Sequence, residues 1–181
     1  MKVLGIDPGT AVVGFGVVES GQGRVARLVE CGVLRTRARE SFPERLVAIH
    51  AAVAEAIARH RPDALAVEGI FYGRNVRTTV VLGHARGVIL LAAAQAGVPT
   101  FEYSPAVIKK TVVGKGGALK PQVGYMVAQL LRLKAAPTPA DAADAVAVAV
   151  THVLKSQVAS RTPAPVTRDG RRARSGGGGT S

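Results

Sequence analysis

The sequence predicts an α/β fold: a mixed sheet, made of an antiparallel meander plus parallel strands, flanked by helices. Two observations indicate this class. An apolar run at residues 3–6 ends in Asp7 and precedes two alternating segments, the pattern of three consecutive antiparallel strands. A second apolar run, residues 64–67, ends in Glu68 after a helical stretch. Because a strand that returns after a helical crossover lies parallel to the first, both acids are expected at one edge of the sheet.

Each predicted element is bounded by residues that start or stop regular structure. Strands are expected at residues 3–7, 12–18, 24–35, 64–68 and 98–103. Helices are expected at about residues 42–60, 77–95, 105–112, 121–133 and 139–154. Ser41, Ser104 and Thr138 each precede a helix that has proline in its first turn. The Ala-Val alternation at residues 145–150 also fits a strand, but the start signal and the alanine content favour a helix.

Length and composition predict one soluble domain. We expect residues 1–156 to form it and residues 157–181, rich in Gly, Arg, Pro and Ser, to be a disordered basic tail. A single cysteine, Cys31, excludes an intramolecular disulfide and fits the cytoplasm, where we expect the protein to reside. The apolar stretch at residues 87–94 is too short to span a membrane, and no export signal precedes the first strand.

The charge of the chain indicates a polyanionic partner. There are 24 Lys and Arg side chains against 12 Asp and Glu, a net charge of +12. Residues 1–154 alone contain 18 basic and 11 acidic side chains, so the expected domain carries +7 without its tail. Nucleic acid is the first candidate for such a surface, although a ribosome-like or non-specific basic character also fits.

Four carboxylates are the candidate catalytic residues. Asp7 and Glu68 end parallel strands, while Asp141 and Asp144 are three residues apart and therefore share one face of the last helix. Converging acids repel one another unless a cation lies between them, and an all-oxygen ligand set suits Mg²⁺ or Mn²⁺. Two such ions can promote phosphoryl displacement. Taken singly, Asp7 could only start a turn, and Asp141 could only complement the helix dipole.

Five short motifs occur in order along residues 1–156. They are Gly5-Ile6-Asp7-Pro8-Gly9-Thr10, Glu68-Gly69-Ile70-Phe71, Phe101-Glu102-Tyr103, Lys109-Lys110-Thr111-Val112-Val113-Gly114 and Asp141-Ala142-Ala143-Asp144-Ala145. Their order and spacing resemble the RuvC family of bacterial Holliday junction resolvases. The resemblance implies a ribonuclease-H-like fold and a homodimer that nicks two opposite strands of a four-way junction with Mg²⁺ or Mn²⁺. It also implies the junction branch-migration proteins RuvA and RuvB as partners.

The same resemblance assigns expected roles to individual residues. Asp7, Glu68, Asp141 and Asp144 fall on the four acids of the family, and some relatives have histidine at the Asp141 position. Lys109 and Lys120 fall on basic residues near the scissile phosphate, and Phe71 on an aromatic that stacks on a junction base. The residues expected to contact DNA are Phe71, Tyr72, Arg74, Arg77, Lys109, Lys110, Lys115 and Lys120.

Simpler explanations exist for several of these residues. A single loop aromatic such as Phe71 often folds back onto the core, and isolated lysines are usually solvated surface charges. The glycine-rich loop at residues 114–120 lacks the spacing of a P-loop and is not expected to bind a nucleotide. The four histidines fit surface or packing positions, and only His152, on the face of Asp144, could approach the acids.

The helix at residues 77–95 is the candidate dimer interface. Gly83 and Gly87 would allow the backbone of a partner to approach closely, although packing within one chain is the commoner use of such glycines. Apolar contact area is expected from Val80, Ile89 and Leu91.

Three other functions compete with a junction nuclease. Asp-x-Gly-Thr after a strand also occurs in ATP-using proteins of the actin and sugar-kinase type, but these need two such domains and this chain has the length of one. A ribonuclease-H-like nuclease acting on RNA is not excluded, since phosphate contacts do not report the sugar. A non-catalytic DNA-binding module is disfavoured, because unneutralised acids facing DNA repel phosphate.

Overall fold

The computed structural model describes residues 1–21, 24–37, 39–69 and 76–161. The strands are β1 (Lys2–Asp7), β2 (Val12–Gly21), β3 (Arg24–Arg35), β4 (Ala64–Glu68) and β5 (Thr100–Tyr103). The helices are α1 (Phe42–His60), α2 (Val76–Gln95), α3 (Pro105–Val113), α4 (Lys120–Leu131) and α5 (Ala140–Arg161).

The five strands form one sheet in the order β3-β2-β1-β4-β5. The pairs β1–β2 and β2–β3 are antiparallel, and the pairs β1–β4 and β4–β5 are parallel. The predicted mixed sheet, with a meander followed by a parallel crossover, is therefore confirmed.

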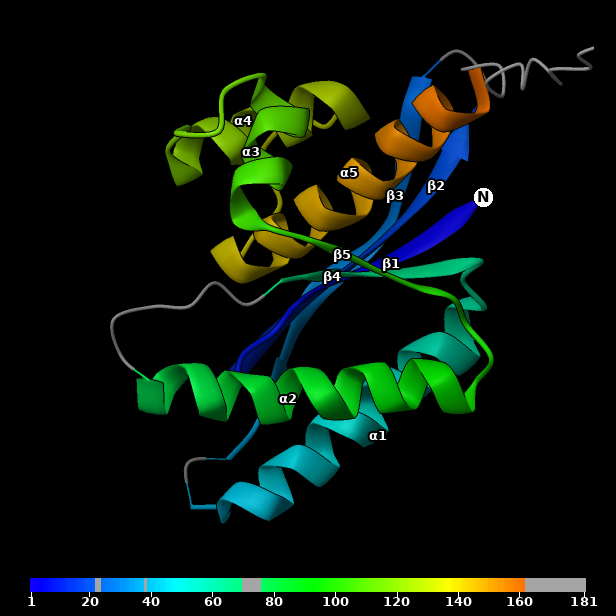
Figure 1. Ribbon diagram of the computed structural model, residues 1–181. Helices are drawn as coiled ribbons and strands as arrows, with labels where there is room; N and C mark the ends of the chain where they lie inside the picture. The colour runs from blue at the N-terminus through cyan, green and yellow to red at the C-terminus, as the bar shows by residue number, and fades with distance from the viewer. Residues whose placement is uncertain (22–23, 38, 70–75, 162–181) are drawn as a thin grey trace, which may run out of the picture.

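Helices cover both faces of the sheet and make three layers. Helices α3, α4 and α5 lie on one face, and α1 and α2 on the other (Figure 1). Successive residues of β1 point to opposite faces, so that Val3 joins the core under α5 while Leu4 and Ile6 join the core under α1 and α2. Burial on both faces explains why this strand is an unbroken apolar run.

Three glycines let α5 lie directly on the middle of the sheet. Gly5 of β1 is paired with Gly16 of β2, and Gly14 of β2 is paired with Asp7. A Cβ placed on Gly5 would lie 2.7 Å from the Ala149 nitrogen, and one on Gly16 would lie 2.9 Å from the Val146 Cα, both closer than real Cβ contacts. The alanine and valine side chains between residues 142 and 150 of α5 are buried on every side of the helix, and their small size allows this close approach.

Most predicted boundaries hold to within two or three residues, and the differences have local causes. The helix expected to start at Pro139 begins instead at Ala140, because the Pro139 carbonyl accepts the first bonds, from the nitrogens of Ala142 and Ala143. It extends to Arg161, beyond the expected domain end at residue 156. The division into a domain and a tail stays a prediction, since residues 162–181 lie outside the described residues.

Two further boundaries shift for similar reasons. The last strand starts at Thr100, not at Val98, because the Val98 nitrogen closes the end of α2 by donating to the Ala93 carbonyl. Helix α4 ends at Leu131, where Arg132 takes a left-handed conformation with φ of 55°. At the start of α1 the predicted Ser41 cap is present, and the Ser41 nitrogen donates to the Glu44 carboxylate at 2.7 Å.

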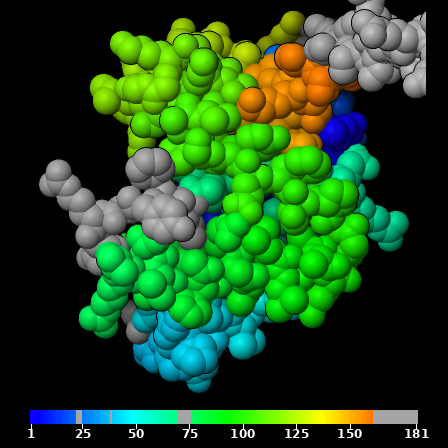
Figure 2. All heavy atoms as spheres, in the orientation of Figure 1, coloured from blue at the N-terminus to red at the C-terminus, as the bar shows by residue number. Residues whose placement is uncertain are grey.

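Among the described residues, α2 is the one helix long and apolar enough to cross a membrane by length and composition. It packs beside α1, and the two helices share the lower part of the surface seen in Figure 2. One stripe of α2 is buried in the core: Ala85, Ile89, Ala92 and Ala93. The opposite side exposes Val80 and Leu91. We interpret α2 as a core helix with a second apolar face, and the absence of a membrane partner stays a prediction.

Candidate active site

Asp7 and Glu68 lie side by side because their strands are in register. Ile6 of β1 is paired with Val67 of β4, so the next residue of each strand is a carboxylate at the same edge of the sheet. This is the carboxyl edge, where open α/β sheets bind ligands. Both side chains are partly buried and line one pocket.

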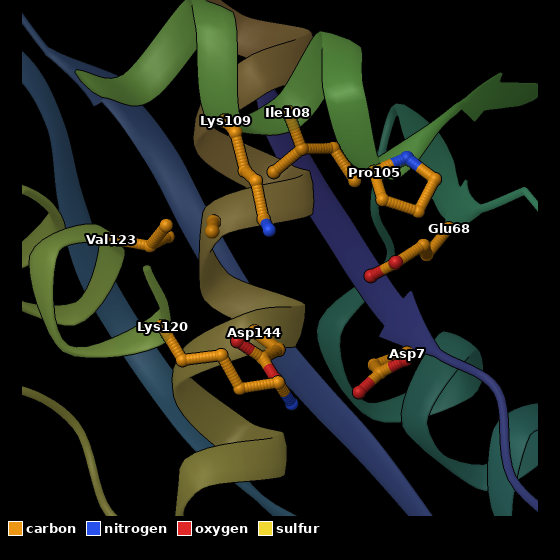
Figure 3. A pocket seen from close by; sticks show the side chains of 9 residues that line it. Asp7, Glu68, Pro105, Ile108, Lys109, Lys120, Val123 and Asp144 are labelled. Atoms are coloured by element: carbon orange, nitrogen blue, oxygen red, sulfur yellow. The ribbon is translucent and has the colours of Figure 1, made fainter. Parts of the chain in front are cut away.

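Asp141 and Asp144 reach the same edge from the first two turns of α5. The start of this helix lies on Gly14, where an added Cβ would overlap the Asp141 carbonyl oxygen, and Gly14 is paired with Asp7. Ligand oxygens of Asp7, Asp141 and Asp144 consequently lie within 4.8 Å of one another. Glu68 is outside this closest group but lines the pocket together with Asp7 and Asp144 (Figure 3).

The acids make the site strongly unfavourable for negative charge. Burial, followed by repulsion from Glu68 and Asp144, raises the pKa of Asp7 to about 7. Burial, followed by repulsion from Asp144, also raises the pKa of Glu68. A cation held by these oxygens would remove the repulsion. The donor set contains only carboxylates and fits a hard divalent ion, so the expected metal site agrees with the residues present.

Two lysines face the acids across the pocket. The Lys120 ammonium, at the start of α4, donates to Asp144 Oδ2 at 2.6 Å, and this hydrogen bond raises the lysine pKa. Lys109 comes from α3, and its side chain points into the pocket (Figure 3). An apolar wall, which sequence reasoning did not identify, completes the pocket: Pro105, Ile108, Val123 and Ala147. Nothing in the sequence indicated that these apolar residues border the acids.

The other residues expected to contact DNA have different positions. Lys110 lies in the last turn of α3 and Lys115 in the loop that follows, and both are exposed. Arg77 is exposed in the first turn of α2 and does not line the pocket. The expected contacts at Phe71, Tyr72 and Arg74 lie outside the described residues.

His152 has a packing position, not a place in the acid cluster. Its Nδ1 and the Tyr103 hydroxyl are joined by a hydrogen bond of 2.8 Å, and its ring lies 4.3 Å from that of Phe101. Burial lowers the pKa of His152. The residue ties α5 to the edge strand β5, in agreement with the expectation that it packs.

The raised pKa of Asp7 predicts a pH-dependent stability when divalent ions are removed. The native state keeps the Asp7 proton up to about pH 7, whereas the unfolded chain loses it near pH 4, so this group lowers stability as pH rises through that interval. Its contribution between pH 5 and pH 8 is at most about 3 kcal/mol, since one pKa unit corresponds to about 1.4 kcal/mol.

Urea unfolding in EDTA at pH 5 and pH 8 measures this contribution. The decrease in unfolding free energy from pH 5 to pH 8 is expected to be smaller in Asp7→Asn than in the wild type. Identical pH dependence in the two proteins would contradict the raised pKa.

A mixed sheet with converging acids at its carboxyl edge, next to lysines, defines a ribonuclease-H-like, metal-dependent nuclease. Comparison with known proteins specifies the family. The family model described as crossover junction endodeoxyribonuclease RuvC matches residues 3–152, so the chain belongs to the RuvC family of hydrolytic endodeoxyribonucleases.

Individual relatives agree with this assignment over nearly their whole length. The crossover junction endodeoxyribonuclease RuvC of Pelotomaculum thermopropionicum is 51% identical over 152 residues, which cover 84% of this chain and 92% of that protein. The structure of Thermus thermophilus RuvC is 42% identical with a TM-score of 0.81, covering 88% of this chain and 97% of that one. The structure of T. thermophilus RuvC in complex with a Holliday junction substrate is 39% identical with a TM-score of 0.80. The match covers 87% of this chain and 96% of that one.

Proposed function

We propose that this protein resolves four-way DNA junctions by paired, metal-dependent nicks, as part of recombination and repair. The observation that carries the proposal is the group of Asp7, Asp141 and Asp144, whose ligand oxygens lie within 4.8 Å of one another beside Glu68 and two lysines. The solved complex of T. thermophilus RuvC with a Holliday junction supports the choice of substrate.

Asp7, Glu68, Asp141 and Asp144 would hold two Mg²⁺ or Mn²⁺ ions in each active site. Bound divalent ions lower the pKa of water and stabilise the attacking and leaving oxygens of a phosphodiester. The protein contributes rigid positions for the acids, from two strand ends and a buried helix. Lys109 and Lys120 line the same pocket as the acids, which supports the proposal that they meet the charge of the scissile phosphate.

The DNA surface would extend from the pocket over the neighbouring basic residues. Lys110 and Lys115 are exposed on the segment between Lys109 and Lys120, so phosphates could follow this edge of the molecule. Phe71, Tyr72, Arg74 and Arg77 follow Glu68 in the chain and are proposed to contact bases and phosphates near the junction centre. No observation favours RNA as the substrate or a non-catalytic role.

Cleavage of a synthetic four-way junction tests this function. The protein is incubated with the junction, with a linear duplex of the same arms and with an RNA–DNA hybrid, each with Mg²⁺, Mn²⁺ or EDTA. Denaturing gels are expected to show two symmetric nicks in the junction and no cleavage of the duplex or the hybrid. The nicks are expected only when Mg²⁺ or Mn²⁺ is present. Preferential cleavage of the hybrid would instead identify an RNA-acting nuclease.

A homodimer would supply the two active sites that paired nicks require, and α2 is its proposed interface. A Cβ placed on Gly83 or Gly87 would have no described atom within 4 Å. These glycines line a mostly apolar groove between α1 and α2 together with Leu46, Val80, His84, Val88 and Leu91. Val80 and Leu91 are about half exposed, at 52% and 49%. Ile89, expected to contribute to this interface, is instead 0% exposed, because it faces the core on the opposite side of the helix.

The variant Gly87→Glu is expected to weaken the dimer at least tenfold, because it would place a charge in an apolar interface without disturbing the fold of one chain. Sedimentation measures the dimer dissociation constant. On a supercoiled cruciform, Gly87→Glu is expected to yield singly nicked DNA in place of linear product. Ala58→Glu, an exposed position on α1 outside the groove, is the matched control. A folded Gly87→Glu protein that remains dimeric would put the interface elsewhere.

Family resemblance also supports two proposals, which concern the partner proteins and the cellular location. The branch-migration proteins RuvA and RuvB are the proposed partners on junction DNA, and the cytoplasm is the proposed location. The single Cys31, which is partly buried, is consistent with a reducing compartment.

A further inference from the structure

The ion pair between Lys120 and Asp144 uses a carboxylate that the metal site also needs. Lys120 Nζ lies 2.6 Å from Asp144 Oδ2, and Asp144 belongs to the three-acid group. An ammonium and a divalent ion close to the same carboxylate repel each other, because both are positive. Full occupation of the site by the lysine and the cation together is therefore unfavourable.

We infer that Lys120 is a displaceable counter-ion, which pairs with Asp144 before the cation binds and is released towards the substrate phosphate when the cation binds. This inference rests on the metal centre of the proposed function and assigns Lys120 two successive partners.

The burial of the two side chains shows which of them can move. The Lys120 side chain is 70% exposed, whereas that of Asp144 is 18% exposed and lies among the buried residues 142, 143 and 145–150 of α5. Lys120 therefore loses little packing when it leaves, and its long flexible stem allows the ammonium to swing. Asp144 is held in place by the contact of α5 with the sheet.

The backbone beneath Lys120 is fixed, so movement is confined to the side chain. The Leu119 nitrogen donates to Gln122 Oε1 at 2.8 Å, and the Val123 nitrogen donates to the Leu119 carbonyl at 3.2 Å. These bonds close the first turn of α4. A released ammonium would stay at the pocket, where Lys109 already points inward (Figure 3).

The release would couple metal binding to phosphate binding. Without the cation, Lys120 forms an ion pair with Asp144, and the negative charge of the other acids repels a phosphate. With the cation, the acids are neutralised and the lysine charge becomes available. Each ligand would then strengthen binding of the other, as linkage requires.

Binding of Mn²⁺ alone, measured by electron paramagnetic resonance without DNA, tests the competition. Lys120→Met keeps an unbranched apolar stem and removes the charge, and it is expected to bind Mn²⁺ about tenfold more tightly than the wild type. Lys109→Met is the matched control, because it removes a pocket charge without removing the partner of Asp144; its affinity is expected to rise by no more than about twofold.

The possible outcomes separate this inference from the proposed function. Mn²⁺ affinity in Lys120→Met that is unchanged or weaker, or that rises equally in both variants, would overturn the counter-ion role while leaving the metal centre intact. Failure of Mn²⁺ to bind any of the three proteins would overturn both.

A second measurement follows the lysine itself. In protein labelled with ¹⁵N-lysine, the ammonium resonance missing from Lys120→Met is assigned to Lys120. Titration with diamagnetic Mg²⁺ is expected to shift this resonance and to speed its hydrogen exchange with water, because the bond to Asp144 is lost. A resonance unchanged at saturating Mg²⁺ would contradict release of the lysine.

Discussion

Replacing Asp7 by asparagine is expected to abolish junction cleavage, with a loss of roughly a thousandfold or more. Asp7 is central to the site: it is next to Glu68 in the sheet register and within 4.8 Å of ligand oxygens of Asp141 and Asp144. Asparagine keeps the shape but removes the charge that holds a divalent ion. Multiple-turnover cleavage of a synthetic junction in Mg²⁺ or Mn²⁺ measures the loss.

Junction binding is expected to persist in Asp7→Asn, because the exposed lysines are untouched and one repulsive charge is gone. Binding is measured by gel shift in EDTA. Asp63→Asn is the matched control: Asp63 accepts a hydrogen bond from the Lys2 nitrogen at 2.7 Å, at the opposite end of β1 and β4. The control is expected to cleave normally. Cleavage retained by Asp7→Asn would contradict the assignment of the metal ligands.

The meeting of the four acids was predictable from simple rules. Parallel strands after a helical crossover end at the same edge, which accounts for Asp7 and Glu68. Spacing of three residues in a helix accounts for the shared face of Asp141 and Asp144. These rules do not give the distance between the two acids on the strands and the two acids on the helix. That distance depends on how closely α5 approaches the sheet.

Other features escaped prediction because several arrangements satisfy the same pattern. Helix α2 is apolar on two sides, so its periodicity did not distinguish the buried Ile89 from the exposed Val80 and Leu91. Lys120 was expected near a phosphate, but its pairing with Asp144 depends on the fold of the loop before α4. Neither lysine spacing nor local propensity specifies such a tertiary contact.

Gly14 decides the approach of α5, and Gly14→Ala is expected to be strongly destabilising. A Cβ at this position would overlap the Asp141 carbonyl oxygen, a backbone atom that can move only with the helix. Overpacking of this kind costs about 1–3 kcal/mol or more. Because Gly14 is paired with Asp7, the strain falls on the contact that brings Asp141 and Asp144 to the strand acids.

Chemical denaturation and Mn²⁺ binding together test the role of this glycine. We expect Gly14→Ala to lose about 2 kcal/mol or more of unfolding free energy and, in the fraction that is folded, to bind Mn²⁺ at least tenfold more weakly. Gly117→Ala is the matched control, because a Cβ there would have no described atom within 4 Å. If Gly14→Ala has the stability and the Mn²⁺ affinity of the wild type, α5 can shift without moving its acids. The contact of α5 with Gly14 would then not position the site.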